Sequence, residues 1–268
     1  MNCGDHSPFE WLILAELMKI EQGILIPATM TPVGEGITGA NYAIVVIGGL
    51  SQRCVVKRAG DREIAAECLC ALLGEALGLP TLTPVVVTDP HDQSLWFGAR
   101  EAGYPSLSSQ LNIGAHANAS QMYALSKILS KWSQIGQVVS FDELIANGDR
   151  NPGNVLWNGS QFTIIDHERS LGIQLKLQNR LAFFATNQFD PPLVASVQSA
   201  STSAALAQQA LLGADEAVWN VISAEFQALP PTFRPHCTTF SSFAKQNVRQ
   251  LVSRTANVMT PLFAGNPP

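Results

Sequence analysis

Residues 147–166 have the sequence NGDRNPGNVLWNGSQFTIID, which contains the strongest short hairpin signal of the chain. An Asn-Gly pair at positions 158 and 159 separates two apolar runs, and this pattern favours a tight β-hairpin. When the hairpin folds back, Asn154 before its first strand comes beside Asp166 after its second strand. Asp149 lies shortly before Asn154, on a turn rich in Gly and Pro. We therefore expect these three side chains to meet at one end of the hairpin.

The chemistry of these side chains indicates a site for magnesium and phosphate. A carboxylate and an amide oxygen suit Mg²⁺, which prefers hard oxygen ligands and keeps positions open for water and phosphate. We expect Asn154 and Asp166 to bind the metal, and Asp149 to face an acceptor hydroxyl. Phosphoryl transfer needs such an arrangement, because catalysis is mostly positioning and neutralisation of charge. The alternative interpretation is an ordinary polar turn, since Asp, Asn, Pro and Gly are common turn residues.

The first hundred residues have the pattern of a sheet that carries one long helix. Runs rich in β-branched and aromatic residues predict antiparallel strands at residues 24–30, 42–47, 53–58, 83–88 and 94–99. Apolar residues at helical spacing predict a helix from Asp61 to Leu77, which Gly78 ends. A capping box at Ser7 predicts a further helix to about Lys19.

The rest of the chain has mainly helical periodicity. We expect a helix from Ser120 to Ile135, and a short helix that begins at a capping box at Ser140 and ends near Asn147. Two more helices are expected at about residues 215–229 and 240–258. The fold class is therefore α+β, with an N-terminal domain of residues 1–100 and a mainly helical C-terminal domain of residues 101–268.

The motif at residues 147–166 is similar to the catalytic loop and metal-binding aspartate of the protein-kinase superfamily. It most resembles the HipA-like kinases, in which an Asn-x-Asp-Arg sequence is followed by Gly-Asn and then by Ile-Asp-His. The matching residues are Asn147-Gly148-Asp149-Arg150, Gly153-Asn154 and Ile165-Asp166-His167. In the N-terminal half the matches are Val55-Val56-Lys57, Glu67-Cys68-Leu69 and the glycine-rich loop Gly34-Glu35-Gly36-Ile37-Thr38-Gly39.

The resemblance implies a two-lobed, protein-kinase-like fold that binds ATP and Mg²⁺. It implies that Asp149 is the catalytic base, that Lys57 contacts the phosphates and that Glu67 orients Lys57. Glu63 lies one helical turn before Glu67 and is the alternative partner of Lys57. The remaining nucleotide contacts implied are with the phosphates and with adenine, at Gly36, Thr38, Gly39, Ala99 and Glu101.

What the resemblance implies about activity is a HipA-type serine/threonine protein kinase, acting on a protein substrate as a toxin opposed by an antitoxin protein. A small-molecule kinase of the same superfamily is one alternative. A pseudokinase-type module that binds nucleotide or a partner without catalysis is the other. No Ala-Pro-Glu element follows Asp166, so an ordinary activation segment is not expected.

Composition limits the class of protein. Hydrophobic residues make up 46% and charged residues 14% of the 268 residues, which is typical of a globular protein. A net charge of -5 argues against direct binding of nucleic acid. No segment is long and apolar enough for a membrane span, and the five cysteines do not suggest a secreted disulfide framework. We expect a cytoplasmic protein.

Overall fold

The computed structural model describes residues 18–34, 39–114, 117–173, 179–186, 191–214, 216–256 and 258. The predicted helix that opens at Ser7 falls almost wholly outside these ranges, and so do Gly36 and Thr38 of the glycine-rich loop. The described residues form two compact units. The barrel unit contains residues 18–103 and 217–241, and the helical unit contains residues 104–216 and the residues from 242 onward.

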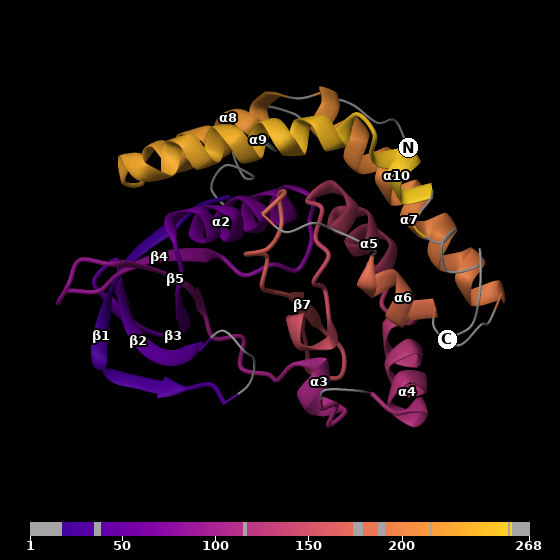
Figure 1. The fold of residues 1–268 in the computed structure, drawn as a ribbon, viewed down its shortest axis with the longest axis horizontal. Helices are drawn as coiled ribbons and strands as arrows, with labels where there is room; N and C mark the ends of the chain where they lie inside the picture. The colour runs from indigo at the N-terminus through magenta and orange to yellow at the C-terminus, as the bar shows by residue number, and fades with distance from the viewer. Residues whose placement is uncertain are drawn as a thin grey trace. The chain divides into compact units, whose positions relative to one another are not determined.

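Five strands form a closed barrel in the order β1-β2-β3-β5-β4 (Figure 1). They are β1 (Glu21–Pro32), β2 (Asn41–Ile47), β3 (Leu50–Arg58), β4 (Pro84–Thr88) and β5 (Leu95–Arg100). All five coincide with the predicted runs, and β2 joins β3 through Gly48 and Gly49, which both have positive φ. Four pairings are antiparallel as predicted, but β1 pairs with β4 in parallel and thereby closes the barrel.

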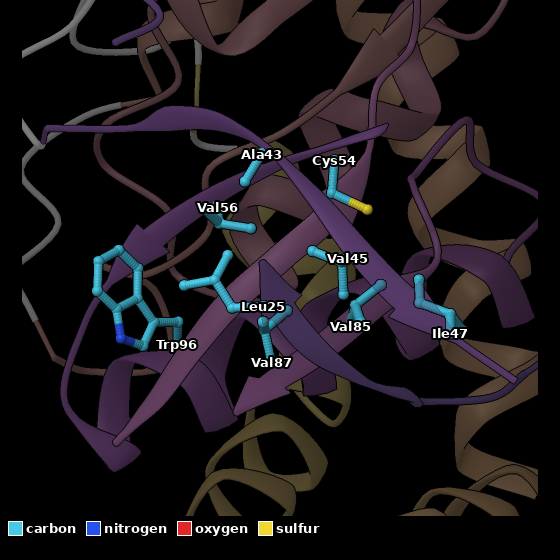
Figure 2. Packing of buried hydrophobic residues seen from close by; sticks show 9 residues of the cluster. All are labelled: Leu25, Ala43, Val45, Ile47, Cys54, Val56, Val85, Val87 and Trp96. Carbon is cyan, nitrogen blue, oxygen red and sulfur yellow. The ribbon is translucent and has the colours of Figure 1, made fainter. Parts of the chain in front are cut away.

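The inside of the barrel is filled by apolar side chains from all five strands (Figure 2). Alternate residues of β2 point inward, among them Ala43, Val45 and Ile47. Two glycines are needed where the packing is closest. A Cβ at Gly23 would lie 2.4 Å from Val45 Cγ1, and one at Gly98 would lie 2.8 Å from Val87 Cγ2. The barrel interior is therefore a packed core.

Helix α2 (Asp61–Ala76) is buried on nearly every face, so its sequence is apolar all round. In the same unit lie α8 (Glu216–Gln227) from residue 217, η2 (Pro231–Phe233) and the first half of α9 (Arg234–Val248). The Ile20 N–H donates to Glu225 Oε2 at 2.7 Å, and the Arg62 guanidinium lies 6.0 Å from the Phe240 ring centre. Segments late in the chain thus complete the core around α2.

The helical unit is built from short elements and one longer helix, α7, which packs against α5, α6 and α10. Its elements are α3 (Leu107–Gln110), α4 (Ala119–Leu129), α5 (Ile135–Leu144), η1 (Pro152–Asn154), β6 (Val155–Trp157), β7 (Phe162–Ile164), α6 (Arg180–Thr186), α7 (Pro191–Ala214) and α10 (Leu251–Ala256). Helices α5 and α7 approach closely, because a Cβ at Gly136 would lie only 2.6 Å from the Ala200 carbonyl carbon. The long helix α7 was not predicted.

Two predicted helix boundaries in this unit are wrong. Helix α4 ends at Leu129 instead of Ile135, and its capping box is made by Asn118 and Gln121. Ser140 does not start a helix, because it lies inside α5 and its hydroxyl donates to Gln208 Oε1 at 2.8 Å. Its Ser-x-x-Glu pattern instead supplies buried polar groups that bind partners distant in the chain.

The last predicted helix also differs from the structure. In place of one helix at residues 240–258, α9 begins at Arg234 and ends at Val248, and α10 follows it from Leu251. The chain is thus a mixed α/β protein with an N-terminal sheet and mainly helical later elements. Among the described residues, no helix has the length and apolar character needed to cross a membrane.

Candidate functional site

The predicted hairpin is present as strands β6 and β7. They pair antiparallel from Val155 with Ile164 to Trp157 with Phe162, and a four-residue turn joins them. Asn158 Oδ1 accepts hydrogen bonds from the backbone N–H groups of Ser160 at 3.0 Å and Gln161 at 2.8 Å. The asparagine therefore closes the turn with its side chain, as Asn often does.

The ends of the hairpin bring the predicted metal ligands together. The Ile165 N–H donates to the Asn154 carbonyl at 3.2 Å, so Asp166 is the residue directly after the one that pairs with Asn154. Asn154 Nδ2 donates to the Asp149 carbonyl at 2.8 Å, which ties the loop to the hairpin. Asp166 has a φ of +63°, a left-handed conformation that few residues other than glycine adopt and that often marks functional sites.

The side chain of Arg150 binds both the loop and the ends of the hairpin. Its side chain is fully buried, and its guanidinium donates to Asp142 Oδ1 at 3.1 Å and Oδ2 at 3.4 Å. The same guanidinium donates to the carbonyls of Asn154, at 3.3 Å, and Ile165, at 2.5 Å. One buried cation thus joins helix α5, the end of the loop and both ends of the hairpin.

The side-chain oxygens at the end of the hairpin suit a hard divalent cation as ligands. Because the Asn154 amide nitrogen is used by the Asp149 carbonyl, the amide oxygen is the atom that can serve as a ligand. Carboxylate oxygens of Asp166 and Glu168 lie within 4.8 Å of one another. Two carboxylates and an amide oxygen match the preference of Mg²⁺ for oxygen. Glu168 is a ligand candidate that the sequence motif did not indicate.

Asp149 is held at both its backbone and its carboxylate. Its N–H donates to Asn147 Oδ1 at 2.9 Å, and Asn151 Nδ2 donates to its carbonyl at 3.1 Å. Its two carboxylate oxygens accept from two arginines, Arg180 at 3.0 Å and Arg169 at 3.3 Å. The sequence did not indicate these two arginines, because neither belongs to the motif and their pairing with Asp149 depends on the fold.

In the barrel unit, the predicted pairing of Lys57 with Glu67 is confirmed. Lys57 Nζ lies 2.6 Å from Glu67 Oε1, and the two residues are 8% and 2% exposed. The Lys57 ammonium also lies 5.5 Å from the centre of the Phe97 ring. Glu63, the alternative partner, instead places a carboxylate oxygen near Gly60 at the start of α2. The roles of Lys57 and Glu67 in catalysis stay predictions.

Of the predicted contacts with the phosphate loop and adenine, Gly39, Ala99 and Glu101 belong to the described part of the barrel unit. Gly39 has a φ of +66° and its carbonyl accepts from Asn41 Nδ2 at 2.9 Å, where the chain enters β2. Ala99 lies in β5, which pairs with a strand on each side. The Glu101 N–H donates to the Arg53 carbonyl at 3.1 Å, so this group is engaged within the sheet. Adenine contact at these positions stays a prediction.

Comparison with known proteins gives a family match and a structural match. A family model described as HipA-like kinase matches residues 52–257. No curated protein matches the sequence significantly. The structure is similar to the proinflammatory kinase CtkA of Helicobacter pylori, with 12% identity, 86% of this chain and 96% of that chain covered, and a TM-score of 0.55.

A second similar structure is HipA of Shewanella oneidensis in a complex with HipB and operator DNA. Its identity is 14%, with 88% of this chain and 65% of that chain covered, and the TM-score is 0.45.

Proposed function

The chain belongs to the HipA-like kinase family, and we propose that it transfers the γ-phosphoryl group of ATP to a serine or threonine hydroxyl of a protein. One observation carries the proposal: the buried Arg150 ties the loop with Asp149 to the hairpin ends that hold Asn154 and Asp166. The buried Lys57–Glu67 pair supports it from the barrel unit. In this proposal the barrel unit is the nucleotide-binding lobe, predicted as residues 1–100, and the helical unit is the catalytic lobe, predicted as residues 101–268.

Each site residue has a distinct part in the proposed reaction. Asp149 accepts the proton of the acceptor hydroxyl while the oxygen forms a bond to the γ-phosphorus and the bond to the ADP oxygen breaks. Lys57, oriented by Glu67, contacts the phosphates. Mg²⁺ supplies neutralisation of charge on the phosphate oxygens. Asn154 and Asp166 would hold it, together with Glu168.

The remaining nucleotide contacts come from the barrel unit. We assign phosphate contacts to Gly36, Thr38 and Gly39, because backbone N–H groups of a glycine-rich loop can approach phosphate closely. Contacts to adenine are assigned to the segment from Ala99 to Glu101. The family resemblance also suggests an antitoxin protein as a partner. A small-molecule acceptor is the alternative to a protein acceptor.

A second candidate function is nucleotide binding without transfer. The observation that favours it is that both carboxylate oxygens of Asp149 already accept hydrogen bonds from arginines, although a base must offer one of them to the acceptor hydroxyl. The two functions differ in the outcome of a transfer experiment.

The test is incubation of the pure protein with radiolabelled ATP, Mg²⁺ and a cell lysate, beside Asp149→Asn. Loss of a general base lowers the rate of transfer by about 10²–10⁴-fold. Asp92→Asn is the matched control, because Asp92 is an exposed aspartate of the barrel unit and should leave the rate unchanged. Equal labelling by wild type and Asp149→Asn would overturn the assignment of the base. Thermal stabilisation by ATP without any transfer would favour the binding function.

A further inference from the structure

Two arginines flank the proposed base on the solvent side. Arg180 Nη1 lies 3.0 Å from Asp149 Oδ1, and Arg169 Nη1 lies 3.3 Å from Asp149 Oδ2. The arginine side chains are 37% and 45% exposed, and that of Asp149 is 25% exposed. Arg180 also lies 5.8 Å from the centre of the Phe184 ring, which helps to fix its direction. The base therefore lies between two accessible guanidinium groups.

The fold does not need these arginines to place the base. The backbone of Asp149 is already fixed by hydrogen bonds with Asn147, Asn151 and Asn154. Ion pairs as exposed as these contribute little to stability, because solvent screens them. In contrast, the neighbouring Arg150 is fully buried and joins several elements. Stability alone gives no reason for two arginines at this position.

The charges around the base can accommodate a further anion. Two guanidinium groups share the single carboxylate of Asp149, and Arg169 also forms a longer ion pair, at 3.9 Å from its Nε to Glu168 Oε1. That distance is too long for a hydrogen bond. An arginine presents up to five donors, so each can bind an incoming carboxylate or phosphate with donors that Asp149 does not use. Such an anion would also draw the arginines away from Asp149 and leave its carboxylate oxygens open to the acceptor hydroxyl.

We infer that Arg169 and Arg180 bind a carboxylate or phosphate group on a peptide acceptor, next to the hydroxyl that is phosphorylated. The inference rests on the proposed function and names its substrate class, an acidic peptide segment. Arg169 and Arg180 are then specificity-determining residues, and they couple the correct acceptor to release of the base. A neutral or basic segment would leave the arginines on Asp149.

Binding is tested first, because it does not require catalysis. A fluorescein-labelled peptide with one serine flanked by glutamates is titrated with the full chain and followed by fluorescence anisotropy. Matched peptides carry glutamine, lysine or phosphoserine in place of the glutamates. The glutamate and phosphoserine peptides should bind about tenfold or more tightly than the glutamine peptide, since one charge-assisted hydrogen bond is of that size.

Variants assign the preference to the two arginines. Arg169→Gln with Arg180→Gln should remove the preference, and replacing both by lysine should keep only part of it, because lysine lacks the planar fork. Arg58→Gln is the matched control, because Arg58 is an exposed arginine of the barrel unit that is ion-paired with Asp92. It should bind all peptides as wild type does. Unchanged preference in the double glutamine variant, or absence of a preference in wild type, overturns the inference.

The same peptides are then used as acceptors with ATP and Mg²⁺. The preference should appear in kcat/KM and be lost in the double glutamine variant. If wild type labels all peptides equally, the proposed function stands and the inference fails. If the acidic peptides bind through the arginines but no peptide or lysate protein is labelled, the acidic site stands and the proposed transfer fails.

Discussion

Replacement of Arg150 by methionine tests how the site is constructed, because methionine has a similar length and no charge. Arg150 is fully buried and paired with Asp142, which is also fully buried. Removal of one member of a buried ion pair costs about 3–5 kcal/mol, because the other charge remains uncompensated. The carbonyls of Asn154 and Ile165 lose a donor as well. We expect a loss at the upper end of that range, which is a large part of the stability of an ordinary domain.

Urea unfolding, followed by circular dichroism and by tryptophan fluorescence, measures this change. Trp132 stacks on Phe162 of the hairpin at 4.5 Å between ring centres, so its emission should respond to loss of order there. The control is Arg58→Met. Arg58 is 67% exposed and paired with Asp92 at 3.4 Å, so its replacement should change the free energy of unfolding by less than about 0.5 kcal/mol.

A double-mutant cycle identifies the ion pair as the cause. Asp142→Leu leaves the Arg150 charge without its carboxylate, whereas Arg150→Met with Asp142→Leu leaves an apolar pair. We expect the double variant to be more stable than the sum of the single changes predicts, by about 1–3 kcal/mol. Additive changes, or a loss below about 1 kcal/mol for Arg150→Met, would refute the idea that this pair holds the site.

Three further predictions concern other parts of the molecule. Gly136→Ala should lower the free energy of unfolding by about 1–3 kcal/mol, because its Cβ would lie 2.6 Å from the Ala200 carbonyl carbon. Gly213→Ala is the control, because the nearest atom to its Cβ would be Val248 Cγ1 at 3.6 Å, and urea unfolding of both variants measures the difference. Burial raises the pKa of Cys54 to about 11, so at pH 8 this thiol should react with a thiol reagent far more slowly in the folded than in the unfolded chain, and equal rates would contradict this. Burial also raises the pKa of Glu75 above 4.5, so its neutral form favours the fold and stability is lost as pH rises through the folded pKa. Glu75→Gln should remove this loss in unfolding measured from acid to neutral pH.

The strands and the hairpin could be predicted because their signals are local. Runs rich in β-branched residues indicate β2 and β3, and two adjacent glycines, which have positive φ in the structure, indicate the turn between them. The turn at Asn158 likewise depends on a side chain that binds its own neighbours. Since both ends of a hairpin are adjacent by construction, the meeting of Asn154 with Asp166 follows from the sequence of the turn.

Features that depend on distant contacts could not be predicted. The parallel pairing of β1 with β4 joins strands about sixty residues apart and has no local signature. Ser140 has the pattern of a helix cap, but it lies inside α5, and its hydroxyl donates to Gln208 of α7. Helix α7 lacks charged residues and has a weak periodicity, because its contacts with α5 involve small side chains and Gly136. Local patterns do not distinguish such packing from a linker.

Within the site as well, some contacts could be predicted from the sequence and others could not. The pairing of Lys57 with Glu67 was expected because the resemblance supplied the order of the residues, and the barrel places them 2.6 Å apart. No pattern of neighbours indicated that Arg169 and Arg180 would flank Asp149, because the fold brings the three together from separate segments. The motif therefore predicts the reacting groups, and the fold adds the groups that surround them.

The buried pair of Arg150 with Asp142 raises the question of what it contributes. A buried ion pair is seldom more stable than an apolar pair of similar volume, because both charges lose their hydration. The guanidinium, however, also binds the carbonyls of Asn154 and Ile165, which methionine cannot do. The double variant Arg150→Met with Asp142→Leu should therefore stay less stable than wild type, although by about 1–3 kcal/mol less than the sum of the two single changes predicts. Its transfer of labelled phosphate should also stay well below that of wild type at a temperature where both are folded, because only the Asn154 amide then ties the hairpin to the loop of Asp149. Wild-type transfer by a stable double variant would mean that the pair contributes only to stability.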